Sequence, residues 1–475
     1  MSDNALGAPG RGRLRIYAGK YWKLSLAFAL YMYYYLTAEL ISTDLAGVAY
    51  GAQAGTVFYG LTCLAGAAGF FAFGLTRPLL SSTGRQRRLL FAAGVVGVCC
   101  ILLAPYIGSA LVGGLLLIAL FAAGYIGGAF LCTIAVSVKE KPTLGMFIAL
   151  PYSLAFLLEF LFGSFEPLLG DALVVVTQAF LAVALATCVI LLLVYESSAP
   201  ADSLPHFERK PGRTKYLWGA LVSCLIISCL FGLMDGIIMH LHTGQVLDVW
   251  SGVRLLTIPG MLCAAWFADY KDGKFFPFAT LLAMVAAVSA VLLWSDAETY
   301  NLALGAVYFF FSFMSIYSLQ VFVRVASDTD RPGLWAAAGR GIKYAAGGVF
   351  ALLGSFIFEN ISFLAIELLY LVLLIILACV FFFQGRLSTV PVAEQPKPTS
   401  PDRAQTFREM VAAYGITERE AEVLRFLLKD TKTSDIAAAM FVAQGTVYKY
   451  ISTMIAKTGK KNRTELVALF APLKD

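Results

Sequence analysis

The sequence predicts an all-α protein: a bundle of twelve transmembrane helices in two groups of six (6+6), followed by a small four-helix domain. Hydrophobic residues make up 59% of the 475 residues and charged residues only 14%, whereas soluble domains carry about 25% charged residues. Twelve apolar runs follow one another as far as residue 384. The chain then changes abruptly to a charged segment, which predicts a second, water-soluble domain.

Each apolar run is long enough to cross a bilayer, because a hydrocarbon core of ~30 Å needs about 20 apolar residues in a helix. The basic N-terminal segment 1–23 is followed by no small-residue cleavage site, so the first run is expected to remain as a span. The twelve predicted spans are 24–43, 56–76, 89–107, 110–137, 144–165, 172–195, 216–241, 247–267, 275–294, 300–323, 333–357 and 361–384.

Lys and Arg occur on only one side of this predicted bundle. The connections after odd-numbered spans contain neither residue. Because cytoplasmic loops carry the excess of Lys and Arg, both termini are expected in the cytoplasm and the protein in the cytoplasmic membrane. The connections after even-numbered spans carry Arg77, Arg85, Arg87, Arg88, Lys139, Lys141, Arg209, Lys210, Arg213, Lys215, Lys271, Lys274, Arg324 and Arg331.

The longest internal connection, 196–215, is rich in Pro, Ser and charge and divides the body into halves 24–195 and 216–384. Basic, Gly-containing turns follow the second and eighth spans, GLTRPLLSSTGRQRR at 74–88 and ADYKDGK at 268–274. Here the sequence resembles the major facilitator superfamily, which implies two parallel six-helix halves. The first turn has Ser81 and Ser82 near the family's acidic position. This departure favours a sensor over a transporter.

Ionisable side chains inside spans indicate a lined cavity or an ion pathway, because a charge within the membrane is costly. Both signs occur, so structural pairing is the alternative. Arg254 and Glu367 are expected at an interface or in such a pair, and His240 and His242 at the outer end of their span. The candidate ligand or ion site consists of Glu39, Glu159, Asp235, Arg340 and Lys343.

The sequence carries no pattern that indicates catalysis or a cofactor. All nine cysteines lie inside apolar runs without metal-ligand spacing, as expected for small buried side chains. Phosphate-binding loops, paired carboxylates and nucleophile motifs are absent from the sequence. We therefore expect neither an enzyme nor a bound cofactor or metal.

A Pro-rich linker, 385–405, leads to the polar segment 406–475, which predicts four helices. Thr417 and Glu420 form a capping box that opens the first helix. The second is predicted at 435–441 and the third at 446–458, where Gly459 is expected as a left-handed cap. A second segment that resembles a capping box begins at Asn462 and opens the fourth helix. Two short helices joined by a tight turn predict a helix-turn-helix.

Basic charge gathers in the last part of this segment. Residues 401–443 carry six basic and seven acidic groups, whereas residues 444–475 carry six basic and two acidic groups. An excess of basic groups favours contact with a phosphate backbone. In the third helix Val447, Tyr450, Ile451 and Met454 form one stripe that is expected to pack inward. The opposite face would suit a major groove about 12 Å wide.

The segment resembles the C-terminal DNA-binding domain of LuxR-type transcription regulators. The resemblance implies a bacterial protein that binds double-stranded DNA and pairs as a homodimer through this domain. The alternative is a helical domain without DNA contact. The matching residues are Thr417, Arg419, Glu420, Glu422, Val423, Leu424, Ile436, Ala437, Thr446, Val447, Lys457, Gly459, Asn462, Arg463, Thr464 and Glu465. The resemblance implies base-facing positions at Tyr448, Lys449 and Ser452. It implies phosphate contacts from Thr446, Lys457, Lys461 and Arg463.

Four positions depart from that family. Ala443 stands where the family has a Ser cap, a loss of ~1 kcal/mol at that helix start. Tyr448 and Tyr450 replace Lys and His, and Thr458 replaces Leu. We expect these changes to alter affinity and sequence preference rather than the fold.

The sequence therefore predicts a membrane-bound one-component regulator. Its body would sense an unknown small molecule or a membrane signal, and its tail would bind DNA. The alternative is a major-facilitator-type transporter with an appended regulatory tail.

Overall fold

The computed structural model divides the chain into two compact units, Met1–Ser388 and Thr389–Asp475. The division falls within the predicted linker. We call the first unit the membrane body and the second the tail, and describe each by itself. The structure describes residues 21–79, 83–106, 109–138, 143–164, 173–198, 213–249, 251–291, 297–388, 407, 409–428, 431, 433–440, 442–460 and 462–470.

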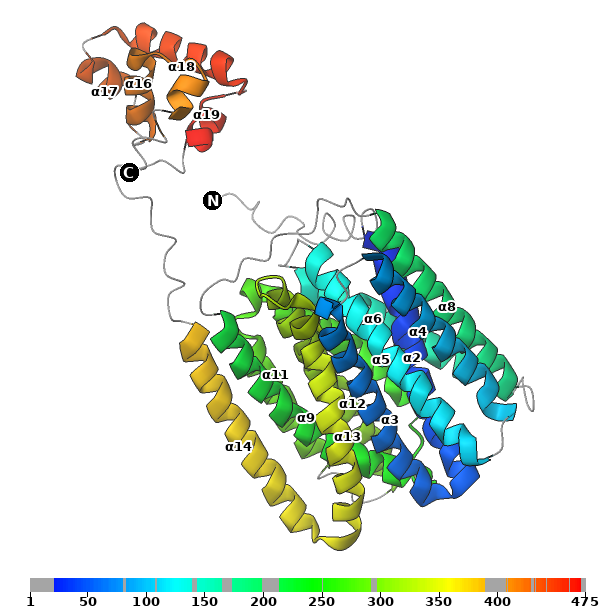
Figure 1. Cartoon of the computed structure of the whole chain (residues 1–475). Coiled ribbons are helices and arrows are strands. Elements are labelled where there is room, and N and C mark those ends of the chain that lie inside the picture. The colour runs from blue at the N-terminus through cyan, green and yellow to red at the C-terminus, as the bar shows by residue number, and fades with distance from the viewer. Residues whose placement is uncertain are drawn as a thin grey trace. The chain divides into compact units, whose positions relative to one another are not determined.

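The membrane body consists of long helices that lie side by side in one bundle (Figure 1). The first half contains α2 (Trp22–Tyr50), α3 (Ala52–Thr76), η2 (Arg77–Leu79), α4 (Thr83–Leu103), η3 (Ala104–Tyr106), α5 (Ser109–Ser137), α6 (Leu144–Gly163) and α8 (Leu173–Ser198). The second half contains α9 (Arg213–Thr243), η7 (Gly252–Leu256), α10 (Thr257–Asp269), η8 (Tyr270–Gly273), α11 (Phe276–Val291), α12 (Ala297–Ala326), α13 (Pro332–Asn360) and α14 (Phe363–Ser388).

Among the described residues of the body, twelve α-helices correspond to the twelve predicted apolar runs. Among the described residues, nine of them are long and apolar enough to cross a membrane. The other three are α10 with 13 residues, α11 with 16 residues and α13, which carries the buried charges Arg340 and Lys343. The chain is a multi-pass membrane protein, and the count of twelve spans stays a prediction.

Glycines allow corresponding helix pairs in the two halves to approach closely. A β-carbon at Gly69 of α3 would overlap the carbonyl oxygen of Phe121 in α5, and one at Gly260 of α10 would overlap that of Phe309 in α12. Small residues are typical of such close contacts between membrane helices. Between the halves, α3 packs along α13 and α6 along α10.

The predicted span 247–267 differs most from the structure. Its first part is a turn followed by the short 3-10 helix η7, and α10 begins only at Thr257. Pro259 fits the first turn of α10, where its missing N–H needs no partner. The side chain of Arg254 holds the irregular part through the carbonyl oxygen of Val249, at 3.4 Å. Hydropathy alone does not reveal this break.

Among its described residues, the tail contains the four helices that the sequence predicts: α16 (Glu418–Leu428), α17 (Thr433–Ala439), α18 (Gln444–Thr458) and α19 (Arg463–Phe470). They enclose a hydrophobic core of their own, separate from that of the body. Val423, Leu424, Ile436, Val447 and Phe470 are among its fully buried members. The predicted second helix at 435–441 begins and ends two residues earlier in the structure.

Candidate functional site

The first turn of α16 is fixed by the predicted capping box. The backbone N–H of Thr417 donates to Glu420 Oε2 at 2.7 Å, and the N–H of Glu420 donates to Thr417 Oγ1 at 3.4 Å. This box satisfies two amides that a helix start leaves without partners. Lys457 Nζ, from the last turn of α18, donates to the same Glu420 oxygen at 2.6 Å.

The ends of α18 follow its local sequence. Ala443 precedes the helix without a side-chain hydrogen bond, as its missing hydroxyl requires. Gly459 closes it in the left-handed conformation, with a φ of 66°. The N–H of Gly459 donates to Ala456 O at 3.3 Å and that of Lys460 to Ile455 O at 3.1 Å. These two bonds form a Schellman motif, which stops the helix before the basic turn.

One face of α18 is buried and the opposite face is open. Val447, Ile451 and Met454 are buried, whereas Tyr450 is half-buried. The residues predicted to face the bases are exposed together on the other side. These residues are Tyr448, Lys449 and Ser452. Because α17 packs against α18, the pair forms a helix-turn-helix whose second helix presents a polar face.

The residues predicted to hold phosphates have several different surroundings. Thr446 is half-buried at the start of α18, and Lys461 lies outside the described residues. The amine of Lys457 binds Glu420 within the tail. Arg463 donates to Thr433 Oγ1 and to Thr431 O, both at 3.3 Å, and thereby holds the start of α17. The roles of these four residues as phosphate contacts stay predictions.

A further helical stretch before α16 was missed by the sequence analysis. Residues 409–413 are helical, and this stretch ends at Gly415, whose φ is 60°. Phe407 and Tyr414 each place their ring 6.2 Å from the ring of Phe470 in α19. The first residues of the tail thus complete its core. Their aromatic spacing and the glycine were the available signals.

In the body, a cavity of about 110 Å³ lies between the two halves. Three of the predicted ligand-site residues line it: Glu39 from α2, Asp235 from α9 and Lys343 from α13. Arg340 lies one turn of α13 from Lys343 and donates to the hydroxyl groups of Tyr152, at 3.0 Å, and Tyr344, at 2.8 Å. We call this the central cavity. The structure therefore brings four of the five predicted residues together.

Neutral side chains accompany the charges of the central cavity. Cys63 donates to Glu39 Oε1 at 3.2 Å, Tyr59 donates to the carboxylate of Asp235, and Lys343 Nζ donates to Ser315 Oγ at 3.2 Å. Within the described residues, no ion pair joins the two carboxylates to the two cations. The arrangement offers donors and acceptors to a small polar molecule.

Glu159, the fifth predicted residue, lies apart from this group. Its Oε2 is 3.1 Å from Nη2 of Arg254; the side chain of Glu159 is buried and that of Arg254 is half-buried. The ion pair joins α6 of the first half to η7 of the second. Arg254 was expected at an interface or in a structural pair, and the structure shows the pair. Arg254 also lines the central cavity, which the sequence analysis did not foresee.

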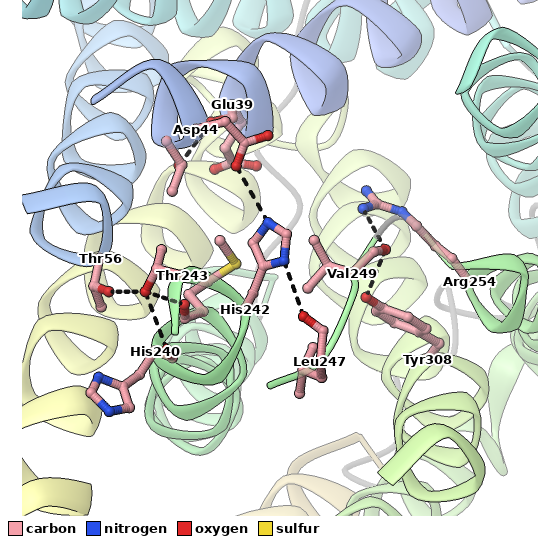
Figure 2. A network of polar contacts seen from close by, with 12 residues as sticks. Glu39, Asp44, Thr56, His240, His242, Thr243, Leu247, Val249, Arg254 and Tyr308 are labelled. Atoms are coloured by element: carbon pink, nitrogen blue, oxygen red, sulfur yellow. Dashed lines mark hydrogen bonds and ion pairs between the residues drawn. The ribbon is translucent and has the colours of Figure 1, made fainter. Parts of the chain in front are cut away.

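Two more polar contacts, from His242 and Thr243, join the halves (Figure 2). His242 of α9 lies 3.3 Å from Asp44 of α2 and 3.3 Å from the carbonyl oxygen of Leu247. The hydroxyl groups of Thr56 in α3 and Thr243 in α9 lie 2.9 Å apart. These contacts lie at the end of the bundle whose connections lack Lys and Arg.

The opposite end of the bundle is joined through the turn at 268–274. Asp269 accepts hydrogen bonds from the backbone N–H groups of Gly145 and Met146, both at 2.8 Å. A carboxylate is favourable at the start of a helix, here α6, because the first N–H groups have no partner there. Arg324 Nη2 lies 3.9 Å from the same carboxylate. This turn therefore performs a structural role between the halves.

Comparison with known proteins identifies the tail. Residues 415–470 match the family described as bacterial regulatory proteins, luxR family. The uncharacterized transcriptional regulatory protein YvfU of Bacillus subtilis (strain 168) is 41% identical over 64 residues, which are 14% of this chain and 32% of that protein. The chain thus spans about a third of YvfU. The spore germination protein GerE of the same organism is 38% identical over 52 residues, which are 11% of this chain and 70% of GerE.

Comparison with solved structures identifies the fold of the body. The human organic anion transporter MFSD10 (TETRAN) is similar with a TM-score of 0.53 and 15% identity, over 77% of this chain and 97% of that chain. The major facilitator superfamily proton:xylose symporter XylE, bound to 6-bromo-6-deoxy-D-glucose, is similar with a TM-score of 0.52 and 13% identity. That match covers 78% of this chain and 95% of XylE. At these identities the likeness concerns the fold alone.

The helix-turn-helix, its capping box and its exposed second helix thus occur in the tail of a chain whose body has the major facilitator fold. By its C-terminal domain, the chain belongs to the luxR family of bacterial regulatory proteins.

Proposed function

We propose that the protein is a membrane-embedded one-component transcription regulator whose body senses a small molecule or a membrane signal. One observation carries this proposal: the same chain holds a body of the major facilitator fold and a luxR-family DNA-binding domain with its own core. A regulator of this kind needs no separate sensor protein. Signalling requires that the ligand bind two arrangements of the body with different affinity.

In the tail, the exposed face of α18 supports a role in base recognition. Tyr448, Lys449 and Ser452 would enter the major groove, where a Lys side chain can donate to guanine. Thr446, Lys461 and Arg463 would contact phosphates on either side, and Lys457 would do so only at the expense of its bond to Glu420. Two copies of the tail would bind as a homodimer.

In the body, the central cavity supports a role in ligand binding. Its carboxylate Glu39 and its cation Lys343 are buried, and its second carboxylate, Asp235, is half-buried. Buried charges within a membrane are retained by use or by pairing. Arg340 would position Tyr152 and Tyr344 against the ligand. The cavity's small volume suits a compact polar molecule.

The alternation of Lys and Arg supports a bacterial cytoplasmic membrane location with both termini in the cytoplasm. This orientation places the tail on the side of the chromosome. It also places the end of the bundle that holds Asp44, His242 and the Glu159–Arg254 pair on the outer side.

A transporter with an appended DNA-binding tail is the second candidate. The observation in its favour is that Asp269, in the turn after the eighth predicted span, accepts two hydrogen bonds from the start of α6. This turn therefore joins the two halves of the body. Uptake into vesicles separates the two candidates. A transporter accumulates its substrate, whereas a sensor binds its ligand without accumulation.

The regulator proposal is tested by footprinting the purified tail on DNA fragments around its own gene. We expect protection of a defined site that disappears with rising salt, since phosphate contacts release counterions. If the tail leaves every fragment unprotected at low salt, even as a forced dimer, the DNA-binding role is wrong and the tail must dock to protein.

A further inference from the structure

A second and larger cavity lies beside the ion pair of Glu159 and Arg254. Its volume is about 480 Å³, within the range of about 300–1,000 Å³ that is common for small-molecule sites. We call it the outer cavity, because it lies at the end of the bundle whose connections lack Lys and Arg. Side chains from α2, α6, α8 and α9 line it, among them Tyr33, Thr37, Asp44, Glu159, Thr177 and His242.

Among the described residues, three buried polar atoms at this cavity have neither a hydrogen-bond nor an ion-pair partner: the hydroxyl groups of Tyr33 and Thr37 and Oε1 of Glu159. The exposed fraction of these residues is 1%, 3% and 4%. Buried polar atoms are nearly always paired in folded proteins, so each unpaired one needs an explanation. Three of them around one cavity are explained by a ligand that supplies the missing donors and acceptors.

The charge of the outer cavity favours a cation. Among the described residues that line it, Glu159 and Asp44 carry carboxylates, His242 contacts the second of these, and Lys and Arg are absent. Arg254 neutralises Glu159 from the side of the central cavity, but the described lining residues offer an anion no Lys or Arg of its own, and an unpaired buried charge is costly in a low-dielectric site. A protonated amine can instead donate to Glu159 Oε1 and to the neighbouring hydroxyl oxygens.

Glu159 also connects this cavity to the central one. Its Oε2 is held by Arg254 at 3.1 Å, and Arg254 itself lines the central cavity together with Asp235. The ion pair therefore has one member at each cavity and one in each half of the body. A cation in the outer cavity that attracts Glu159 removes the counterion of Arg254. Arg254 is then free to pair with a carboxylate of the central cavity.

We propose that the outer cavity binds a small molecule with a protonated amine, and that this amine competes with Arg254 for Glu159. The proposal rests on the regulator function above and names its ligand class. Binding weakens one of the contacts that hold the two halves together at this end. A ligand shifts the population between two arrangements of the body only if it binds one of them more tightly. Breaking a contact between the halves would provide that difference.

The test measures binding of n-hexylamine, 1-hexanol and hexanoate to the full chain in nanodiscs by isothermal titration calorimetry, with empty nanodiscs as the blank. The three compounds share an alkyl chain and differ in charge. We expect the ammonium to bind at least about tenfold more tightly than the alcohol, the gain typical of a charge-assisted hydrogen bond in a buried site, and hexanoate not to bind. Equal affinity of the amine and the alcohol would overturn the proposal.

Variants locate the site. Glu159→Gln should abolish the preference for the amine, whereas Glu367→Gln, the same change in α14 away from the cavity, should keep it. The double variant Glu159→Arg with Arg254→Glu retains an ion pair and so protects folding, but it should lose amine binding. Thr37→Val removes an unpaired hydroxyl without touching the pair and should weaken amine binding about threefold to tenfold. Amine binding that survives all three cavity variants would place the site elsewhere.

Failure of this proposal is distinguishable from failure of the proposed function. Calorimetry reports on the body whether or not the tail binds DNA, and footprinting reports on the tail whether or not an amine binds. Loss of amine preference with intact DNA protection would overturn only the ligand class.

Discussion

The amine of Lys457 lies 2.6 Å from the buried carboxylate of Glu420, across 37 positions of the sequence. The contact joins the last turn of α18 to the capping box that opens α16. A lysine that family resemblance assigns to DNA phosphates thus also holds the second helix of the helix-turn-helix against the first helix of the tail.

Replacing Lys457 by Met should therefore destabilise the tail. We expect a loss of about 1–3 kcal/mol in the free energy of unfolding, because the change leaves a buried carboxylate without its charge-assisted partner. Urea unfolding of the isolated tail measures it. Lys449→Met, the same change on the exposed face of the same helix, is the control and should leave stability within about 0.5 kcal/mol. Equal midpoints for the two variants would contradict the structural role of Lys457.

The same contact makes the stability of the tail depend on pH. Burial alone would raise the pKa of Glu420, but hydrogen bonds from Lys457 and from Thr417 lower it below its usual value. A carboxyl group with a lowered pKa in the folded state adds stability that is complete above the pKa of an unfolded glutamate, about 4.3. This stability is lost as the pH falls through the lower pKa of the folded state. Unfolding of wild type and Glu420→Gln should therefore differ at pH 7 and converge in acid.

Ala443→Ser should stabilise the tail by about 1 kcal/mol. The start of α18 has no side-chain cap, and a Ser hydroxyl there can accept a hydrogen bond from an N–H of the first turn. Thermal unfolding of the isolated tail measures the gain, and the preferred DNA sequence should not change. Ala439→Ser, which places the same hydroxyl at the end of α17 rather than at a helix start, should give no gain.

Lys449→Ala should reduce discrimination between the specific site and random DNA by about 1–3 kcal/mol, because the exposed amine would lose a contact with a base edge. Titration of both DNAs at fixed salt measures the difference. Arg419→Ala is the control and should leave discrimination intact, because Arg419 lies on the exposed surface of α16, where its side chain donates to Glu422.

Arg463→Ala should weaken binding to all DNA sequences alike. The slope of log binding constant against log salt concentration should fall by about one, as expected for the loss of one phosphate contact. Because Arg463 also holds Thr433 and Thr431, the variant should unfold more easily than wild type. Unchanged salt dependence together with reduced stability would show that Arg463 is structural and does not touch DNA.

Reporter fusions test the orientation of the body. Fusions at Gln245 and at Asp475 should report opposite sides of the membrane, since the positive-inside rule places the connection after α9 outside and the tail inside. Reporters on the same side would contradict the twelve-span topology.

The sequence by itself determined the elements whose signals are local. Hydropathy predicted the helices of the body, since each span must satisfy its backbone within itself. The capping box at Thr417 and Glu420, the left-handed Gly459 and the buried stripe of α18 all depend on residues within a few positions of one another. Such signals predicted the four helices of the tail and the face that α18 leaves exposed.

Only the tertiary structure decided which distant side chains meet. It placed Glu159 beside Arg254 instead of with Glu39 and Asp235, joined Lys457 to Glu420, and brought Phe407 against Phe470. The first part of the eighth predicted span is equally apolar whether helical or not, so only its contacts with neighbouring helices show where α10 begins. Each of these outcomes depends on how helices pack together. Helical periodicity fixes which face a helix buries, but not which partner it meets there.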